Sequence, residues 1–333
     1  MQGLPLAKLH IRKVLSMTDG YGREITYLRL SVTELCNLRC RYCMPEEGLC
    51  KKAHSEMLSE EEMVLAAEVA VEVGVKKIRI TGGEPLVKPN ILSICQKISR
   101  ISGLEALCLT TNGLLLPQYA HALRNAGVSR INISLDTLDE KKYAHMTRGG
   151  KLEQALEGLN AAFDAGFQKV KINTVLIGGF NEDEIIPLAE LTRQYPVDVR
   201  FIEMMPVQTR DEFGKEAFFP NRRVKELLPT AKAVPQGDGV ARLYRLPDAQ
   251  GNIGLISPVS GSFCSACSRI RLTADGKLKP CLHTAQEFSL KGLDKDGMMT
   301  QFLAAIAAKP RCHGGLSAQS RSRAGRNMNQ IGG

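Results

Sequence analysis

The stretch "YLRLSVTELCNLRCRYCMP", residues 27–45, joins a short apolar segment to a group of three cysteines. Its first six residues are typical of a β-strand, because they are rich in apolar and β-branched side chains. Cys36, Cys40 and Cys43 then follow within eight residues of one another. Thiolates bind soft or borderline metals, so zinc, copper and iron–sulfur are the candidates. The stretch therefore predicts a strand that leads into a metal-binding loop.

A repeating pattern of strands and helices extends from this stretch to about residue 203. The expected strands are 27–32, 76–80, 106–110, 130–135, 169–176 and 198–203, and the expected helices are 59–73, 88–101, 117–125, 151–164 and 182–194. Strands that alternate with helices form a parallel sheet through right-handed crossovers. Six such units are fewer than the eight of a closed barrel. The predicted fold is therefore α/β, a partial (βα)6 TIM-like barrel.

The pattern changes after about residue 206, where loops and shorter strands replace it. The organisation that we expect is an N-terminal extension (1–24), the partial barrel (25–206), a C-terminal region that closes the barrel's open side (207–320) and a flexible tail ending in Gly-Gly (321–333). The first residues are basic and amphipathic, and they lack the continuous apolar core of a secretory signal. We therefore expect a cytoplasmic protein.

Composition narrows the class of partner. The chain has 333 residues, lacks tryptophan and is only 5% aromatic, so a stacking platform for single-stranded nucleic acid is not expected. No apolar run approaches the length that spans a bilayer, so a membrane is not expected either. The net charge is +9, and residues 309–333 carry five basic residues and no acid. This excess favours an anionic partner, such as a phosphorylated small molecule.

A second group of three thiols lies at Cys264, Cys267 and Cys281. Structural zinc requires four closed ligands, and each group offers only three cysteines. Candidates for a fourth zinc ligand are Cys50 and His54 for the first group, and His283 and Cys312 for the second. A [4Fe–4S] cluster has four irons that each take one outside ligand, so three cysteines leave one iron open. We interpret both groups as cluster sites whose open iron receives a small molecule.

Polar and flexible residues recur where the predicted parallel strands end. They are "TGGEP" at 81–85, "TTNG" at 110–113, Ser134, Asp136, Lys171, Asn173, Met204 and Met205. The carboxyl ends of such strands converge on one face, which is where barrels of this kind place their sites. The two glycines of "TGGEP" permit close backbone approach, and its carboxylate suits an ammonium group. One binding face is therefore predicted.

The Cys-x3-Cys-x2-Cys spacing, with Tyr42 before the last cysteine, resembles that of radical S-adenosylmethionine enzymes. The resemblance implies that the open iron of the first cluster binds the amino and carboxylate groups of S-adenosylmethionine. Reduction would then release a 5'-deoxyadenosyl radical. Carried over by motif, the residues that would meet S-adenosylmethionine are Tyr42, Gly83, Ser134 and Met205.

From about residue 24 onward the chain is similar to the GTP 3',8-cyclase family, lyases that act first in molybdenum cofactor biosynthesis. The matching stretches include "IRITGGEPL", "ISLDTL", "CSACSRIRLTADGKLKPCL" and the terminal "IGG". The resemblance implies that the second cluster contacts the purine of GTP and that basic residues hold the triphosphate. The GTP contacts implied by motif are Arg29, Arg79, Thr110, Lys171, Arg269 and Arg271, and the tail glycines that would reach the site are Gly332 and Gly333. No Walker loop is present, so side chains must bind the nucleotide.

The implied reaction converts GTP to 3',8-cyclo-7,8-dihydro-GTP, and no catalytic residue is identified beyond the cofactor ligands. The resemblance also implies an electron donor of the reduced flavodoxin or ferredoxin type, a downstream cyclic pyranopterin monophosphate synthase and a homodimer. Two alternatives stay open. A peptide-modifying radical maturase would be expected to carry more auxiliary cysteines, and a basic RNA-binding module would carry zinc.

Overall fold

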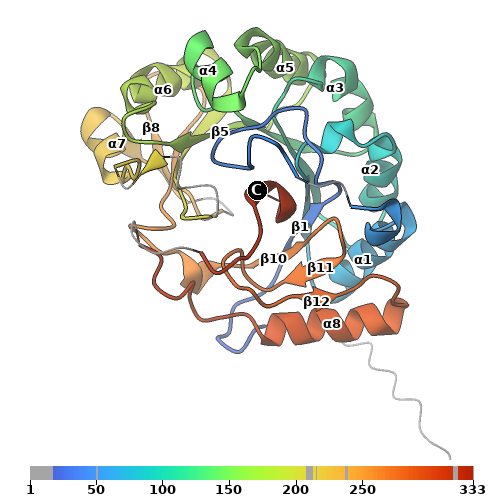
Figure 1. The fold of residues 1–333 in the computed structure, drawn as a ribbon. Helices are drawn as coiled ribbons and strands as arrows, with labels where there is room; N and C mark the ends of the chain where they lie inside the picture. Colours follow the sequence, from blue (N-terminus) through green and yellow to red (C-terminus); the bar gives the residue numbers. More distant parts are fainter. Residues whose placement is uncertain are drawn as a thin grey trace, which may run out of the picture.

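The computed structural model describes residues 18–49, 52–207, 213–214, 216–236, 239–317 and 322–332. A curved sheet lies at the centre and helices surround its outer side (Figure 1). The first six strands are β1 (Tyr27–Ser31), β2 (Lys77–Thr81), β3 (Ala106–Thr111), β4 (Arg130–Ser134), β5 (Val170–Leu176) and β6 (Val197–Glu203). The helices between them are α1 (Glu60–Glu72), α2 (Ile91–Ser99), α3 (Leu116–Asn125), α4 (Glu140–Thr147), α5 (Leu152–Asp164) and α6 (Ile185–Gln194). The partial α/β barrel predicted from the sequence is confirmed.

The residues after β6 continue the same sheet at both of its edges. Their elements are α7 (Arg222–Leu227), β7 (Lys232–Ala233), β8 (Arg242–Arg245), β9 (Ile253–Ile256), β10 (Arg269–Leu272), β11 (Lys277–Lys279), β12 (Phe288–Ser289) and α8 (Lys295–Ala307). The strand order is β12-β11-β10-β1-β2-β3-β4-β5-β6-β9-β8-β7. β10 lies parallel to β1 and β9 lies parallel to β6, whereas the outer strands are antiparallel. Two distant segments therefore extend the parallel part of the sheet.

Three helices were not among those predicted. α4 is preceded by Asp139, whose side chain accepts a hydrogen bond from the backbone N–H of Lys142, and it is followed by Arg148 in a left-handed conformation. α8 is preceded by Asp294, whose side chain accepts from the backbone N–H of Gly297, and it packs against α1. α7 is a short helix of six residues. Within the described part of the chain, no helix is long and apolar enough to cross a membrane.

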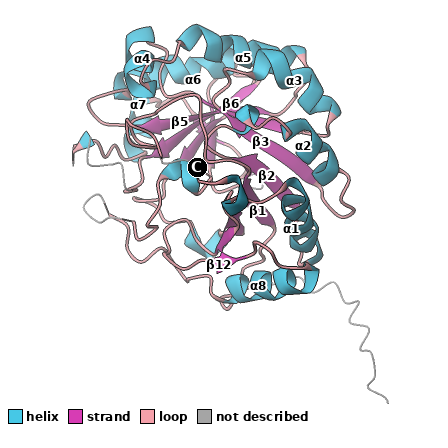
Figure 2. Ribbon diagram, turned by 45° about the vertical axis from the view of Figure 1, so that its right-hand side comes forward, coloured by secondary structure: helices cyan, strands magenta, loops and turns pink. Residues whose placement is uncertain are grey.

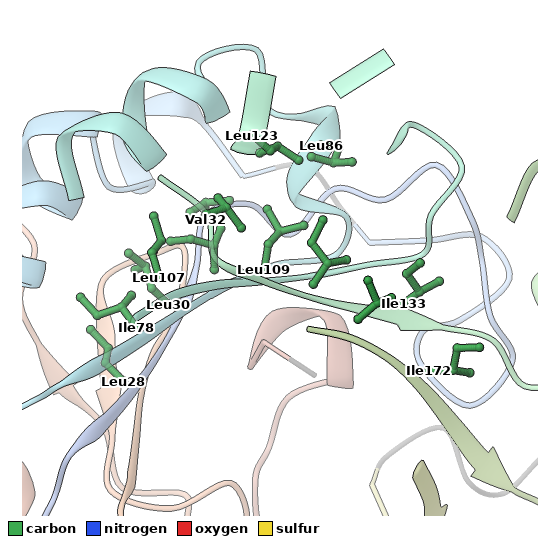
Figure 3. Close-up of a cluster of buried hydrophobic side chains, with 14 of the residues drawn as sticks. Leu28, Leu30, Val32, Ile78, Leu86, Leu107, Leu109, Leu123, Ile133 and Ile172 are labelled. Carbon is green, nitrogen blue, oxygen red and sulfur yellow. The ribbon is translucent and has the colours of Figure 1, made fainter. Parts of the chain in front are cut away.

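The apolar core lies between the sheet and the surrounding helices. Figure 3 shows alternate strand residues such as Leu28, Ile78 and Leu109 on the side of the sheet that meets Leu123 of α3. Because side chains alternate along a strand, the residues between them face the opposite side. In closed TIM barrels that inner side is filled with branched apolar residues. Here it carries Arg29, Arg79 and other polar residues, so the interior is a site rather than a second core.

The last described segment, 322–332, runs into the middle of the molecule (Figures 1 and 2). Asn329 and Ile331 are both 1% exposed. The flexible tail expected for 321–333 is therefore, over its described residues, a packed segment. The apolar Ile331 and the hydrogen-bonding groups around it find partners inside the barrel that a solvated tail would lack. Gly333 lies outside the described residues.

Candidate active site in the barrel interior

The first cysteine group lies on the loop that leaves β1. Cys36, Cys40 and Cys43 line one cavity of about 190 Å³. The loop is tightly bonded to itself, because the backbone N–H of Cys43 donates to the carbonyl of Cys40 at 2.9 Å and Arg39 donates to the carbonyl of Cys36 at 2.6 Å. Arg148, just after α4, donates to the carbonyl of Arg39 at 2.8 Å. The loop thus presents three thiols to one enclosed space.

The three cysteines of this group are partly buried. Burial raises the pKa of Cys36 to about 11 and that of Cys43 to about 12, and it also raises the pKa of Cys40. Without a cation the thiols therefore stay protonated, and a metal that binds them must displace those protons. The backbone N–H of Asn329 in the tail donates to the Cys43 sulfur. Three soft ligands around one cavity fit an iron–sulfur cluster, in which such N–H donors to sulfur are usual.

The glycines of "TGGEP" allow the loop after β2 to press against the cysteine loop. The backbone N–H of Gly83 donates to the carbonyl of Thr33 at 2.8 Å. A Cβ on Gly83 would lie 2.3 Å from the carbonyl oxygen of Leu35, and one on Gly82 would lie 2.7 Å from that of Thr33. Any side chain here would force the two loops apart. Both glycines line the same cavity as the thiols.

The carboxylate of Glu84 joins two loops of the rim. It accepts hydrogen bonds from the Thr111 hydroxyl at 2.8 Å, from the backbone N–H of Asn112 at 2.7 Å and from that of Leu86 at 3.0 Å. Burial raises the pKa of Glu84 to about 7. The carboxylate that the sequence suggested for an ammonium group thus fastens the loop after β2 to the end of β3. The neighbouring glycines face the cavity instead.

The four residues assigned by motif to S-adenosylmethionine line this smaller cavity together. They are Tyr42, Gly83, Ser134 and Met205. The Tyr42 hydroxyl donates to Asp136 at 2.9 Å, and the other oxygen of Asp136 accepts from the backbone N–H of Val175 at 2.8 Å. Burial raises the pKa of Asp136 to about 6. The Tyr42 ring is therefore held in place by the ends of β4 and β5.

A larger cavity of about 350 Å³ lies beside the second cysteine group, and its walls are strongly basic. Cys264, Cys267 and Cys281 line it. Strand register places Arg271, Arg29 and Arg79 side by side on β10, β1 and β2. The cations that line it are Arg29, Lys77, Arg79, Arg130, Lys171, Arg200, Arg269, Arg271 and Lys309, and no carboxylate of the described chain lines it.

Most of the residues assigned by motif to GTP meet in this larger cavity. Arg29, Arg79, Lys171, Arg269 and Arg271 all line it. Thr110 lines the smaller cavity instead, within 3.4 Å of the Arg79 guanidinium. Four further cations that line this cavity were not predicted from the sequence, namely Lys77, Arg130, Arg200 and Lys309. Lys77 could have been found, because it lies two positions before Arg79 on the same strand and so shares its face.

Crowding of positive charge changes how these groups titrate. Burial and the neighbouring Arg271 lower the pKa of Arg29, and burial with Arg269 lowers the pKa of Arg271 to about 10. Burial alone would raise the pKa of Tyr27, but Arg79, Arg29 and Arg269 outweigh it and lower the pKa to about 8. The larger cavity is thus prepared for a polyanion, which would relieve this repulsion.

The second cysteine group differs electrostatically from the first. Burial would raise the pKa of Cys267, but Lys309, the backbone N–H of Arg269 and the nearby guanidinium groups outweigh it, so that the pKa is lowered. The carbonyl of Cys264 accepts a hydrogen bond from Arg23 at 2.7 Å. The surrounding cations therefore outweigh the effect of burial on the Cys267 thiol. Three thiols at a cation-rich cavity fit a cluster with an anionic ligand beside it.

The proposed fourth ligands of a zinc site are placed differently from one another. His54 is exposed, and Cys50 lies outside the described residues. His283 is hydrogen-bonded through Nδ1 to Ser322 at 2.9 Å, and Cys312 is exposed. Among the residues that the structure describes, no three histidine, cysteine or acidic side chains surround a position for a single metal ion.

The two cavities adjoin, and the tail reaches both. Asn173, Ile202 and Met205 line the larger and the smaller cavity alike. The carbonyl of Gly332 accepts from Arg29 at 3.0 Å and from Arg271 at 2.7 Å. A ligand in one cavity would therefore lie next to a ligand in the other.

Two family models match the chain. The Radical SAM superfamily model matches residues 30–192, and the Molybdenum Cofactor Synthesis C model matches residues 197–314. A curated protein from Alkaliphilus oremlandii named GTP 3',8-cyclase is 46% identical, over 95% of this chain and 100% of the relative. Another of that name, from Pelotomaculum thermopropionicum, is 47% identical with the same coverage.

The solved structures that the fold resembles include Streptococcus suis SuiB bound to precursor peptide SuiA. The TM-score is 0.60 at 15% sequence identity, and the match covers 88% of this chain and 67% of that one. At this identity the likeness concerns the fold alone.

Proposed function

The chain belongs to the GTP 3',8-cyclase family of radical S-adenosylmethionine enzymes, and we propose that its two adjoining cavities hold the two reactants of that reaction. It is a lyase that converts GTP to 3',8-cyclo-7,8-dihydro-GTP in the first step of molybdenum cofactor biosynthesis. Its cofactors are [4Fe–4S] clusters and S-adenosylmethionine. The assignment of one reactant to each cavity rests on one observation: each cysteine group lines its own cavity, while three other residues line both cavities.

In this proposal the smaller cavity is the site of radical generation. Cys36, Cys40 and Cys43 would hold the first cluster. Tyr42, Gly83, Ser134 and Met205 would hold S-adenosylmethionine beside it, and their common cavity supports this. When bound, these cofactors would supply the radical chemistry that removes hydrogen from the ribose 3' carbon of GTP. The protein orients the reactants and excludes water.

The larger cavity is the proposed GTP site. Cys264, Cys267 and Cys281 would hold the second cluster at the purine end. The residues that would bind the triphosphate are Arg29, Arg79, Lys171, Arg269 and Arg271, and Thr110 would lie where the two sites meet. A triphosphate carries about three to four negative charges, and guanidinium groups bind phosphate oxygens through paired hydrogen bonds. The cation-rich lining supports this assignment.

The tail completes the site in this proposal. Gly332 accepts hydrogen bonds from Arg29 and Arg271, so it aligns two of the proposed phosphate-binding cations. We propose a role in the site for Gly333 as well, which lies outside the described residues. We also propose that residues 25–206 form the radical-generating unit and that 207–320 carry the second cluster.

Partners and location are inferred from the same reaction. Radical generation requires single electrons, which a reduced flavodoxin or ferredoxin would supply, and the cyclised product would pass to a cyclic pyranopterin monophosphate synthase. We further propose a homodimer. Free thiols and reducible clusters suit a reducing compartment, which supports a cytoplasmic location.

Anaerobic reconstitution tests the division between the cavities. We expect about eight irons and eight sulfides per chain, and 5'-deoxyadenosine with cyclised nucleotide when GTP, S-adenosylmethionine and a reductant are added. In Cys281→Ala we expect about four irons, S-adenosylmethionine binding close to that of the wild type and no cyclised nucleotide. Equal loss of S-adenosylmethionine binding and of cyclised nucleotide in a folded Cys281→Ala protein would contradict separate roles for the cavities.

A further inference from the structure

Lys309 is a buried lysine with no carboxylate partner among the residues that the structure describes. The residue lies just after α8 in the sequence and is 4% exposed. Its Nζ donates hydrogen bonds to the carbonyls of Arg269 at 2.6 Å and Pro280 at 2.9 Å. No carboxylate in the described ranges forms an ion pair with it. The equally buried Lys279, by contrast, pairs with Glu287 at 3.0 Å. A buried ammonium requires a compensating negative charge, and peptide carbonyls supply only part of it.

The two carbonyls that accept hydrogen bonds from Lys309 belong to residues close to cysteines of the second group. Pro280 directly precedes Cys281, and Arg269 follows Cys267 by two residues. The ammonium therefore bridges the two backbone segments that present these thiols.

The third cysteine of the group is tied to the same stretch of chain. Arg23 donates to the carbonyl of Cys264 at 2.7 Å, to that of Arg311 at 3.1 Å and to that of Pro310 at 2.7 Å. Unlike Lys309, Arg23 has its own acid, because it pairs with Asp19 at 2.6 Å. Residues 309–311 thus connect all three cysteine segments, and Lys309 places a buried ammonium group in this connection.

We propose that Lys309 is the countercharge of the second cluster, which it both positions and makes easier to reduce. The proposal rests on the assignment of a [4Fe–4S] cluster to Cys264, Cys267 and Cys281. Reduction adds one negative charge to the cluster, and a positive charge held nearby in a low-dielectric interior stabilises the reduced state. Lys309 acts through the cluster and its ligands, so it is a positioning residue.

The GTP triphosphate is the competing source of negative charge, because Lys309 also lines the larger cavity. The hydrogen bonds favour the cluster. Both acceptors of Lys309 lie on cysteine segments, whereas Arg79, Arg130 and Lys171 project into the cavity from the barrel strands. A triphosphate-binding lysine would be expected to extend from the wall without being held at the cluster ligands.

The test uses full-length protein in which Cys36, Cys40 and Cys43 are replaced by alanine, so that only the second cluster contributes a signal. In this background Lys309→Gln removes the charge and keeps an N–H donor, and Lys309→Arg keeps both. Lys277→Gln, which removes a solvent-exposed charge on nearby β11, is the matched control. Iron content, the midpoint potential from an electron paramagnetic resonance titration and GTP binding without reductant are measured for each.

For Lys309→Gln we expect the reduced-to-oxidised ratio of the second cluster at a fixed potential to fall about tenfold, which is about 59 mV for one electron. Lys309→Arg should restore the ratio to within about twofold, and Lys277→Gln should leave it unchanged. Loss of the cluster from Lys309→Gln but not from Lys309→Arg would support the positioning role.

An unchanged potential in Lys309→Gln, with or without weaker GTP binding, would overturn the proposal and assign the charge to the triphosphate or to folding alone. Absence of iron from the parent background would instead contradict the assignment of the second cluster, and the role of Lys309 with it. The two failures are therefore distinguished by the parent protein.

Discussion

Single residues set the electrostatics of the larger cavity. Arg200 shows this well, because its Nε is buried and has no hydrogen-bond partner within the described structure. Burial lowers its pKa, and Asp198, which would raise it, also pairs with Lys171 at 2.8 Å. A buried donor without a partner is costly unless a ligand completes it. An anion bound in this cavity could therefore accept the hydrogen bond that the Nε of Arg200 lacks.

Arg200→Met should weaken GTP binding by about tenfold to a hundredfold, because a hydrogen bond to a charged group contributes about 1.5–3 kcal/mol. Binding of S-adenosylmethionine should stay within about twofold of the wild type. Equilibrium binding under anaerobic conditions measures both, and Arg193→Met on the exposed face of α6 is the control. Equal GTP affinity in the two variants would remove Arg200 from the site.

Tyr27 reports the charge of the same cavity through its titration. Arg79 donates to its hydroxyl at 2.6 Å, and the surrounding cations lower its pKa from 10.0 to about 8. The pKa of Tyr27 is lower in the folded than in the unfolded chain. Ionised Tyr27 therefore contributes its full share to the free energy of unfolding above pH 10, and this contribution is lost as the pH falls toward 8. Phenolate absorbance of the ligand-free protein should show a tyrosine that ionises near pH 8 and is missing in Tyr27→Phe. Identical titrations of the two proteins below pH 9 would contradict this.

At the scale of elements, the site depends on how closely loops at the strand ends approach one another. The loop after β2 lies on the cysteine loop after β1 through Gly82 and Gly83, and Glu84 fastens it to the end of β3. These contacts fix the thiols before any cofactor binds. They also explain why glycines rather than small side chains stand at this point.

Gly83→Ala should displace the cysteine loop, because its Cβ would lie 2.3 Å from the carbonyl oxygen of Leu35. We expect the first cluster to be lost, with about four of eight irons remaining, and S-adenosylmethionine binding to fall at least tenfold. The control is Gly20→Ala, whose Cβ would meet nothing within 4 Å. Full iron content in Gly83→Ala would show that the loops tolerate separation.

Elements with a local sequence pattern could be predicted, whereas elements placed by long-range pairing could not. The strands β1 to β6 were found because apolar runs and helical patterns alternate locally along the chain. α4 was missed because it is short and polar, with only Tyr143, Met146 and Thr147 buried. The positions of β9 and β10 at opposite edges depend on pairing between segments more than 50 residues apart, which no local pattern encodes.

The candidate site was predictable where motifs mark it and less so elsewhere. The cysteines and Arg79 belong to recognisable stretches, whereas Arg130 and Arg200 are single basic residues in strands. Their role depends on which face of the sheet is the interior, and the sequence alone does not decide that face. Lys309 shows the same limit, because its environment comes from β10 and the segment before Cys281.

At the scale of the whole molecule, the C-terminal segment is part of the interior. Gly332 binds Arg29 and Arg271, and Asn329 lines the smaller cavity and donates to the carbonyl of Glu34 at 3.0 Å. Residues 322–332 therefore connect the strands that carry the proposed phosphate-binding cations to the loop that carries the first thiols.

Gly332→Ala should disturb this connection, because its Cβ would lie 2.5 Å from the Thr81 hydroxyl at a φ of +68°. Gly325→Ala is a matched control, since its φ is +66° and its Cβ would meet nothing within 4 Å. Both carry the same backbone strain, so we expect kcat to fall more than tenfold only in Gly332→Ala. Comparable rates for the two variants would show that the Thr81 contact does not matter.

In the proposed function, a radical formed at the first cysteine group acts on the ribose of GTP held beside the second. The most direct measurement is mass spectrometry of the 5'-deoxyadenosine that the reconstituted enzyme forms from GTP carrying deuterium at the ribose 3' carbon. We predict that this 5'-deoxyadenosine contains one deuterium and that cyclised nucleotide accumulates with it. Formation of 5'-deoxyadenosine without deuterium would contradict the account.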